Sequence, residues 1–179
     1  MSTLPVTSIK NFLNQSVESP THISVAAVLQ NTEGKILCHF FKKEDLPHES
    51  EGKSDLYLFM RESLHLNESL ETAVSRGLME EYGAEGKVID FLGTIVSHFP
   101  SSDNATVTIE KTVLYFLVDL ISLDETKREA GAVESRSQLL WLAPDDLLEK
   151  NQTQAARYSR TDIDDSKIIR DYIQRYESK

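Results

Sequence analysis

The segment 62–84, ESLHLNESLETAVSRGLMEEYGA, constrains the fold of this chain more than any other part of it. Asn67 is a good N-cap and Gly83 is a good helix stop, so we expect a helix over about 68–82. Small and apolar residues recur in it at helical spacing. They predict a buried stripe made of Leu70, Ala73, Val74, Gly77, Leu78 and Tyr82.

Acidic side chains end this helix, where the helix dipole disfavours negative charge by about 0.3–1 kcal/mol per exposed group. Glu80 and Glu81 therefore call for a cation. Arg76 can supply one from four residues before Glu80, and a divalent metal ion could supply another. A solvated charged face is the plainer alternative for a Glu-Glu pair taken alone.

The spacing of these residues resembles the Nudix box: Gly, any five, Glu, any seven, Arg-Glu-aliphatic-any-Glu-Glu-any-Gly-aliphatic. Two positions depart from it, because Glu62 stands at the opening Gly and Gly77 at the Glu after the Arg. Ala84 is a weak match to the final aliphatic residue. The matching residues are Glu68, Arg76, Leu78, Glu80, Glu81 and Gly83.

The resemblance implies an α/β fold, an α/β/α sandwich with a mixed central sheet. It also implies a hydrolase that uses Mg²⁺ or Mn²⁺ to split the pyrophosphate of a nucleoside diphosphate linked to another moiety. On that likeness Glu81 and Glu80 bind metal, and Arg76 orients them. Glu68 pairs with a basic group or a metal-bound water, or is merely a partner of the helix dipole. The implied partner is a small phosphorylated substrate.

Gly77 removes a carboxylate one helical turn before Glu81 and costs a helix interior about 1 kcal/mol relative to Ala. Three explanations stay open: another acid fills the gap, water fills it, or the domain has lost catalysis and acts as a nucleotide-binding or protein-interaction module. The candidate acids are Glu62, Glu110, Glu129 and Glu134. The resemblance also favours Glu134 as a later catalytic glutamate, because it lies in the loop before Trp141.

Substrate signals are few. Pro100 resembles the downstream proline of ADP-ribose pyrophosphatases, which favours an ADP-ribose-like substrate or a nucleotide sugar, although a proline in a turn is common. Phe99 beside it is a candidate for stacking on a base, with core packing as the alternative. Four arginines could meet phosphates, but we expect solvated charges: Arg128, Arg136, Arg157 and Arg160.

The composition of the chain limits the class of protein to which it can belong. The chain has 179 residues, which suits one domain. A net charge of −10 argues against nucleic-acid binding. The single Cys38 excludes an internal disulfide and predicts a buried thiol in a reducing compartment. We find neither an apolar run long enough to span a membrane nor a signal peptide, so we expect a cytoplasmic protein.

The rest of the chain predicts a scaffold around the box. We expect an N-terminal arm over 1–20, a Nudix-like domain over 21–150 and a C-terminal helix over 151–179 on the same domain. That helix, capped by Thr161 or Asp162, packs on its own sheet or forms a homodimer contact. Strands are expected over 23–30 and 36–43 as a hairpin, and over 56–60, 88–99 and 106–121, with a short helix over 144–150 and charged loops over 42–55 and 124–136.

Overall fold

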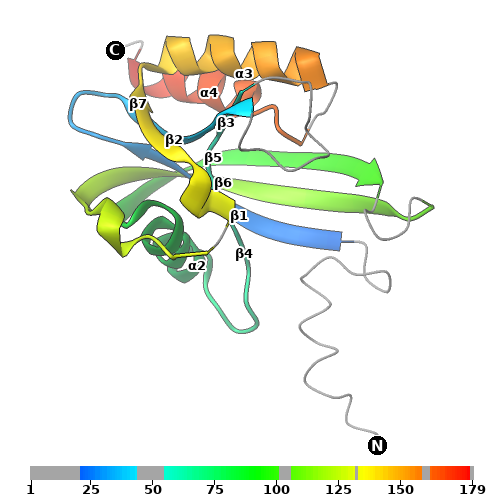
Figure 1. The fold of residues 1–179 in the computed structure, drawn as a ribbon, viewed down its shortest axis with the longest axis horizontal. Coiled ribbons are helices and arrows are strands. Elements are labelled where there is room, and N and C mark those ends of the chain that lie inside the picture. Colours follow the sequence, from blue (N-terminus) through cyan, green and yellow to red (C-terminus); the bar gives the residue numbers. More distant parts are fainter. Residues whose placement is uncertain (1–20, 44–54, 101–105, 132, 159–161, 178–179) are drawn as a thin grey trace, which may run out of the picture.

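A computed structural model describes residues 21–43, 55–100, 106–131, 133–158 and 162–177. One mixed sheet forms the middle layer, with helices on both of its faces (Figure 1). The strands are β1 (Thr21–Gln30), β2 (Ile36–Phe41), β3 (Leu56–Leu58), β4 (Met60–Ser63), β5 (Ala84–Pro100), β6 (Thr108–Leu123) and β7 (Gln138–Leu142). The helical elements are α2 (Leu70–Gly77), η3 (Leu78–Tyr82), η4 (Glu125–Lys127), η5 (Val133–Arg136), α3 (Pro144–Tyr158), α4 (Ser166–Tyr172) and η6 (Ile173–Glu177). This architecture confirms the predicted α/β/α sandwich.

Strand β1 lies at the centre of the sheet. It runs parallel to β6 and antiparallel to both β2 and β4, while β5 pairs with β6, and β3 and β7 pair with β2. The β1–β4 register places Glu62 opposite Val25. The short strand that leads into the box is therefore fixed directly against the centre of the sheet.

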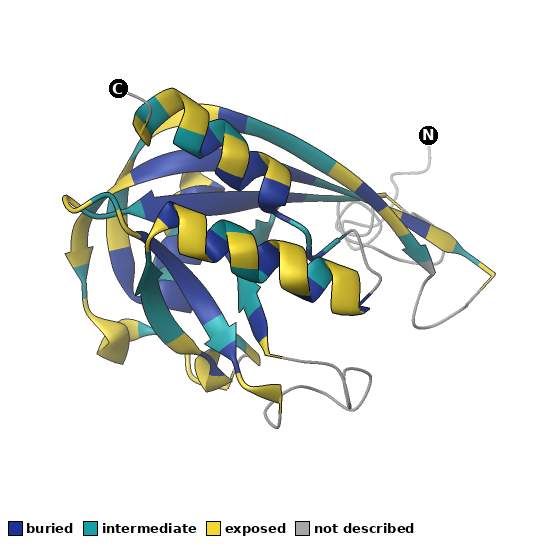
Figure 2. Ribbon diagram, turned by 90° about the horizontal axis from the view of Figure 1, so that it is seen from above, coloured by how far each residue is buried: buried dark blue, intermediate teal, exposed yellow. Residues whose placement is uncertain are grey.

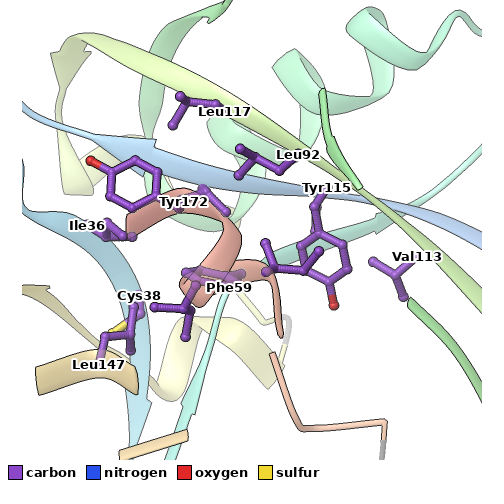
Figure 3. Close-up of a cluster of buried hydrophobic side chains, with 13 residues drawn as sticks. Ile36, Cys38, Phe59, Leu92, Val113, Tyr115, Leu117, Leu147 and Tyr172 are labelled. Carbon is purple, nitrogen blue, oxygen red and sulfur yellow. The ribbon is translucent and has the colours of Figure 1, made fainter. Parts of the chain in front are cut away.

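Alternate side chains of β1 pack into two separate hydrophobic cores, as expected for a strand that is covered on both faces. Ala26 and Val28 belong to the core beneath α3 and α4, which also contains Cys38 and Tyr115 (Figure 3). The remaining β1 core residues, Val25, Ala27 and Leu29, face α2 and η3. In Figure 2, α3 and α4 show buried residues next to exposed ones, as amphipathic helices on a sheet do.

The predicted hairpin and the buried thiol are confirmed, and β5 has an irregularity at Gly93. Strands β1 and β2 are joined by the turn that contains Gly34. The β5–β6 register shifts between Phe91 and Gly93, where Gly93 has a positive φ of 148°. Cys38 is fully buried.

Several boundaries were wrong. The segment 56–60 splits at Phe59 into β3 and β4, and α3 extends to Tyr158 rather than ending near residue 150. Helix α4 begins at Ser166 after the N-cap position Asp165, so Asp162 does not cap it. The arm over 1–20, most of the loop over 42–55, Thr161 and Arg160 lie outside the described residues.

The box helix also begins later than predicted. Ser69, not Asn67, is its N-cap: the Ser69 side chain accepts a hydrogen bond from the Thr72 N–H. Asn67 instead has a positive φ of 64° in the preceding loop. Leu70 is 38% exposed, so it does not belong to the buried stripe.

Gly83 ends the helix as predicted, in the left-handed conformation with φ 66°. A Cβ on Gly83 would lie 2.2 Å from the Asp124 carbonyl oxygen, so glycine also lets the loop after β6 approach closely. The last turn before it, η3, has π-helical geometry. Such turns occur frequently at functional sites.

Candidate active site

Arg76 is the centre of an ionic network on the box helix. Its Nε and Nη2 donate to the two carboxylate oxygens of Glu68, both at 2.9 Å. Its Nη1 lies 3.1 Å from Glu62 and 3.3 Å from Glu80. The Arg76 hydrogen bonds hold the pKa of Glu68 at about 2, well below its usual range. One guanidinium thus orients three carboxylates.

Glu81 is the buried carboxylate of the site, with 8% exposure. Its Oε1 accepts from the Arg61 backbone N–H at 3.2 Å, and its Oε2 lies 2.8 Å from His39 Nε2. Burial, followed by the charges of Glu134 and Glu62, raises the pKa of Glu81 well above its usual value. Burial and the charge of Arg128 lower the pKa of His39 to about 3, so the imidazole is neutral at pH 7.

A second arginine fastens the loop after β6 to the box. Arg128 Nε donates to the Glu81 carbonyl oxygen at 2.7 Å, and its Nη2 donates to the carbonyl oxygen of Glu134. Its Nη1 donates to the Ser137 carbonyl oxygen at 3.1 Å. The Glu129 N–H donates to the Glu80 carbonyl oxygen at 2.7 Å. Arg128 is therefore a structural clamp, and its expected role as a solvated charge was wrong.

These contacts surround a pocket of about 250 Å³. Its lining consists of Arg61, Glu62, Ser63, Glu80, Glu81, Glu129 and Glu134. The one arginine in this lining is committed elsewhere, because Arg61 Nη2 lies 2.5 Å from Asp165 Oδ1 and its Nη1 donates to the Asp162 carbonyl oxygen at 2.6 Å. The pocket is consequently acidic, with carboxylates from β4, η3 and the loop after β6.

The structure brings together most, but not all, of the residues selected from the sequence. Glu80, Glu81 and Glu134 line the pocket, and Arg76 contacts it through Glu62 and Glu80. Among the described residues, Glu68, Phe99 and Glu110 are not in the pocket lining. Phe99 and Pro100 lie at the end of β5, and Glu110 pairs with His98 at 3.2 Å.

The donor chemistry of the pocket fits Mg²⁺ or Mn²⁺, which prefer carboxylate oxygens. Within the described ranges, no three His, Cys, Asp or Glu side chains are grouped as a metal-holding cluster. The contacts explain this, since Arg76 holds Glu62, Glu68 and Glu80, while His39 holds Glu81. Magnesium commonly uses one or two carboxylates together with water and substrate phosphates, so a closed protein cage is not required.

The sequence interpretation missed His39 altogether and assigned Arg128 no structural role in the site. His39 reaches Glu81 across 42 positions, and Arg128 reaches the Glu81 carbonyl across 47. Neither has a local pattern that signals this role, because both contacts depend on how β2 and the loop after β6 meet the box helix.

Comparisons with known proteins agree with this geometry. The sequence matches the family model described as NUDIX domain over residues 20–162. No curated protein matches it. Similar solved structures include a NUDIX hydrolase from Nitrosomonas europaea, with a TM-score of 0.58 at 18% identity over 85% of this chain and 88% of that one. They also include the MutT protein of Methanosarcina mazei Go1, with a TM-score of 0.53 at 19% identity over 90% of this chain and 99% of that one.

The family model covers most of the chain and includes β1 through α3 as well as the whole box. The structural likeness extends to a third protein, E. coli ORF135, with a TM-score of 0.51 at 19% identity over 78% of this chain and 89% of that one. No helix in the described part of the chain is long and apolar enough to cross a membrane. The chain belongs to the Nudix family.

Proposed function

We propose that this protein is a divalent-metal-dependent hydrolase that cleaves the pyrophosphate of a nucleoside diphosphate linked to another moiety. The carrying observation is the acidic pocket, which Glu62, Glu80, Glu81, Glu129 and Glu134 line together. A pyrophosphate is itself anionic and would be repelled by these carboxylates. A bound cation removes that repulsion, so Mg²⁺ or Mn²⁺ is the expected cofactor.

Glu81 and Glu80 would hold the metal, while Glu68, outside the pocket lining, would pair with the basic group Arg76. The bound metal would supply charge stabilisation on phosphate oxygens and lower the pKa of a water molecule. His39 and the Arg61 N–H hold Glu81 in place from two sides. Arg76 orients the other carboxylates of the box through its contacts with Glu68 and Glu80.

Glu134 is our candidate for the general base. It lines the pocket from η5, and Arg128 fixes its backbone through the carbonyl oxygen. A carboxylate in this position can take the proton from an attacking water molecule, provided that the water lies within hydrogen-bond reach. The catalytic set is thus Arg76, Glu80, Glu81 and Glu134.

An ADP-ribose-like compound or a nucleotide sugar is the favoured substrate, because Pro100 resembles the downstream proline of ADP-ribose pyrophosphatases. Phe99 and Pro100 stay the predicted substrate contacts; they lie at the end of β5, outside the pocket lining. The cytoplasmic location and a homodimer also stay predictions.

The test is a Mg²⁺ and Mn²⁺ hydrolysis panel that covers ADP-ribose, nucleotide sugars, dinucleoside polyphosphates and nucleoside triphosphates. We expect turnover of at least one nucleoside diphosphate derivative. Glu81→Gln should lower it by about 100-fold or more, since even residues that merely orient metal ligands contribute about 10–100-fold. Glu110→Gln makes the same charge change outside the pocket and should have no effect.

Turnover that survives in Glu81→Gln would refute the site. Absence of turnover on every substrate, combined with a higher melting temperature in the presence of ADP-ribose, would instead favour the alternative of a catalytically impaired binding module.

A further inference from the structure

The two departures from the Nudix box are neighbours in space. Gly77 ends α2, and a Cβ built on it would lie 2.8 Å from the Glu62 Cβ and 2.5 Å from the Met60 Sδ. Both distances are far shorter than ordinary contact between such atoms. The helix therefore lies directly on β4, and this approach requires a residue without a side chain at position 77.

This close contact between α2 and β4 explains why position 77 is a glycine, which the sequence alone did not explain. The Met60 thioether is the flexible end of a side chain and could move, but the Glu62 Cβ is fixed to the backbone of a strand paired with β1. A glutamate at 77 would thus collide with Glu62 even if the Met60 side chain moved away. Glu62 already occupies the space into which a side chain at 77 would have to grow.

Glu62 also places its carboxylate among the site residues. It lines the same pocket as Glu80 and Glu81, and its Oε1 lies 3.1 Å from Arg76 Nη1. The other candidate acids are placed differently: Glu129 and Glu134 come from the loop after β6, and Glu110 pairs with His98 outside the pocket lining. Glu62 is the acid whose Cβ is among the three atoms nearest to a Cβ built at position 77.

We propose that Glu62 and Gly77 are a reciprocal exchange, in which strand β4 supplies the metal-binding carboxylate that the Nudix box otherwise carries on its helix. The box pattern has Gly first and Glu after the Arg; this chain has Glu first and Gly after the Arg. Glu62 is then a metal ligand, and Gly77 is the small residue that leaves room for it. This inference rests on the proposed metal-dependent function.

The experiment is a titration of the full chain with Mn²⁺, in which electron paramagnetic resonance measures the free Mn²⁺. A melting curve is recorded for each variant. Glu62→Gln keeps the size of the side chain and should weaken Mn²⁺ binding about 10-fold or more. Glu110→Gln is the matched control and should bind Mn²⁺ as the unaltered protein does.

The reversed exchange gives a second, independent readout. Gly77→Glu alone should lower the melting temperature by several degrees, because its side chain overlaps Glu62. Glu62→Gly alone should lose Mn²⁺ affinity. The double variant Glu62→Gly/Gly77→Glu should have a higher melting temperature than Gly77→Glu and a higher Mn²⁺ affinity than Glu62→Gly. It restores one Gly and one Glu at the contact.

The outcomes separate the two proposals. If the unaltered protein binds no Mn²⁺, the proposed function and the exchange both fail. If it binds Mn²⁺ and Glu62→Gln binds equally well, the exchange is wrong while the proposed function stands; a lower melting temperature alone in that variant would show that Glu62 merely pairs with Arg76.

Discussion

Individual side chains in this site are held by partners from distant parts of the sequence. Arg76 binds Glu62, Glu68 and Glu80, all within the box, but Glu81 depends on His39 from β2 and on the Arg61 N–H from β4. The Arg76–Glu80 pair follows from helical spacing and could be predicted. The distant contacts require the packed sheet.

His22 illustrates how such packing affects stability. Its Nε2 lies 2.8 Å from Ser63 Oγ, and burial, followed by the charge of Lys111, lowers its pKa to about 4. The folded protein thus resists protonation of His22 between pH 6.5 and 4, whereas the unfolded chain accepts the proton. Its stabilising contribution is present above pH 6.5 and is lost as the pH falls.

We therefore expect the free energy of unfolding to fall over this pH range, and His22→Asn to flatten the decline. The imidazole is half-buried, so solvent screening keeps the difference well below the roughly 1.4 kcal/mol per pH unit that one full proton would give. Urea unfolding at several pH values measures it. An equal flattening in the control His65→Asn, which alters an exposed histidine, would contradict the assignment.

Helix α3 shows why some elements were predicted less well than others. Beyond residue 150, α3 buries Asn151 and Gln154 instead of an apolar stripe. Gln154 Oε1 accepts from the Tyr57 N–H, and its Nε2 donates to the carbonyl oxygens of Tyr57 and Ile163. A helix face that is buried through amide hydrogen bonds leaves no hydrophobic periodicity, so the second half of α3 was missed.

The start of the box helix was misplaced for a related reason. Asn67 and Ser69 are both favourable N-cap residues, and the choice between them depends on the loop that carries Glu68 to Arg76. That loop turns at Asn67 with a positive φ, which leaves Ser69 to cap the helix. The end was predictable because Gly83 is the one residue there suited to the left-handed conformation.

The contact between α4 and β4 is a buried ion pair. Asp165, before α4, is fully buried, and its Oδ1 meets Arg61 Nη2 at 2.5 Å and accepts from the Tyr115 hydroxyl at 2.5 Å. Removing one partner of such a pair leaves an uncompensated charge. This contact joins the C-terminal helix to the strand that leads into the site.

Asp165→Ala should therefore lower the free energy of unfolding by about 3–5 kcal/mol. The control Asp171→Asn breaks the solvent-exposed pair with Lys167, at 3.0 Å, and should cost about 0.5 kcal/mol or less. Denaturant unfolding measures the free energy of unfolding of both variants. Similar decreases in the two would show that the buried pair does not anchor α4.

The protein as a whole combines a predictable fold with a site whose details the sequence left open. The pattern of strands around one acidic helix led to the α/β/α sandwich, because the two hydrophobic layers follow from strand and helix periodicity. The meaning of Gly77 could not be predicted from its position in the helix. It depends on the approach of α2 to β4, which brings Glu62 into the space of the missing side chain.

The central claim is that the acidic pocket of this Nudix protein binds a divalent metal although position 77 lacks a carboxylate. Its most direct test is the anomalous difference density of a crystal grown with Mn²⁺. We predict a peak in the pocket, bound by oxygens of Glu80, Glu81 and Glu62 at about 2.0–2.3 Å. A crystal that holds Mn²⁺ only outside this pocket, or none at concentrations that support hydrolysis, would contradict the claim.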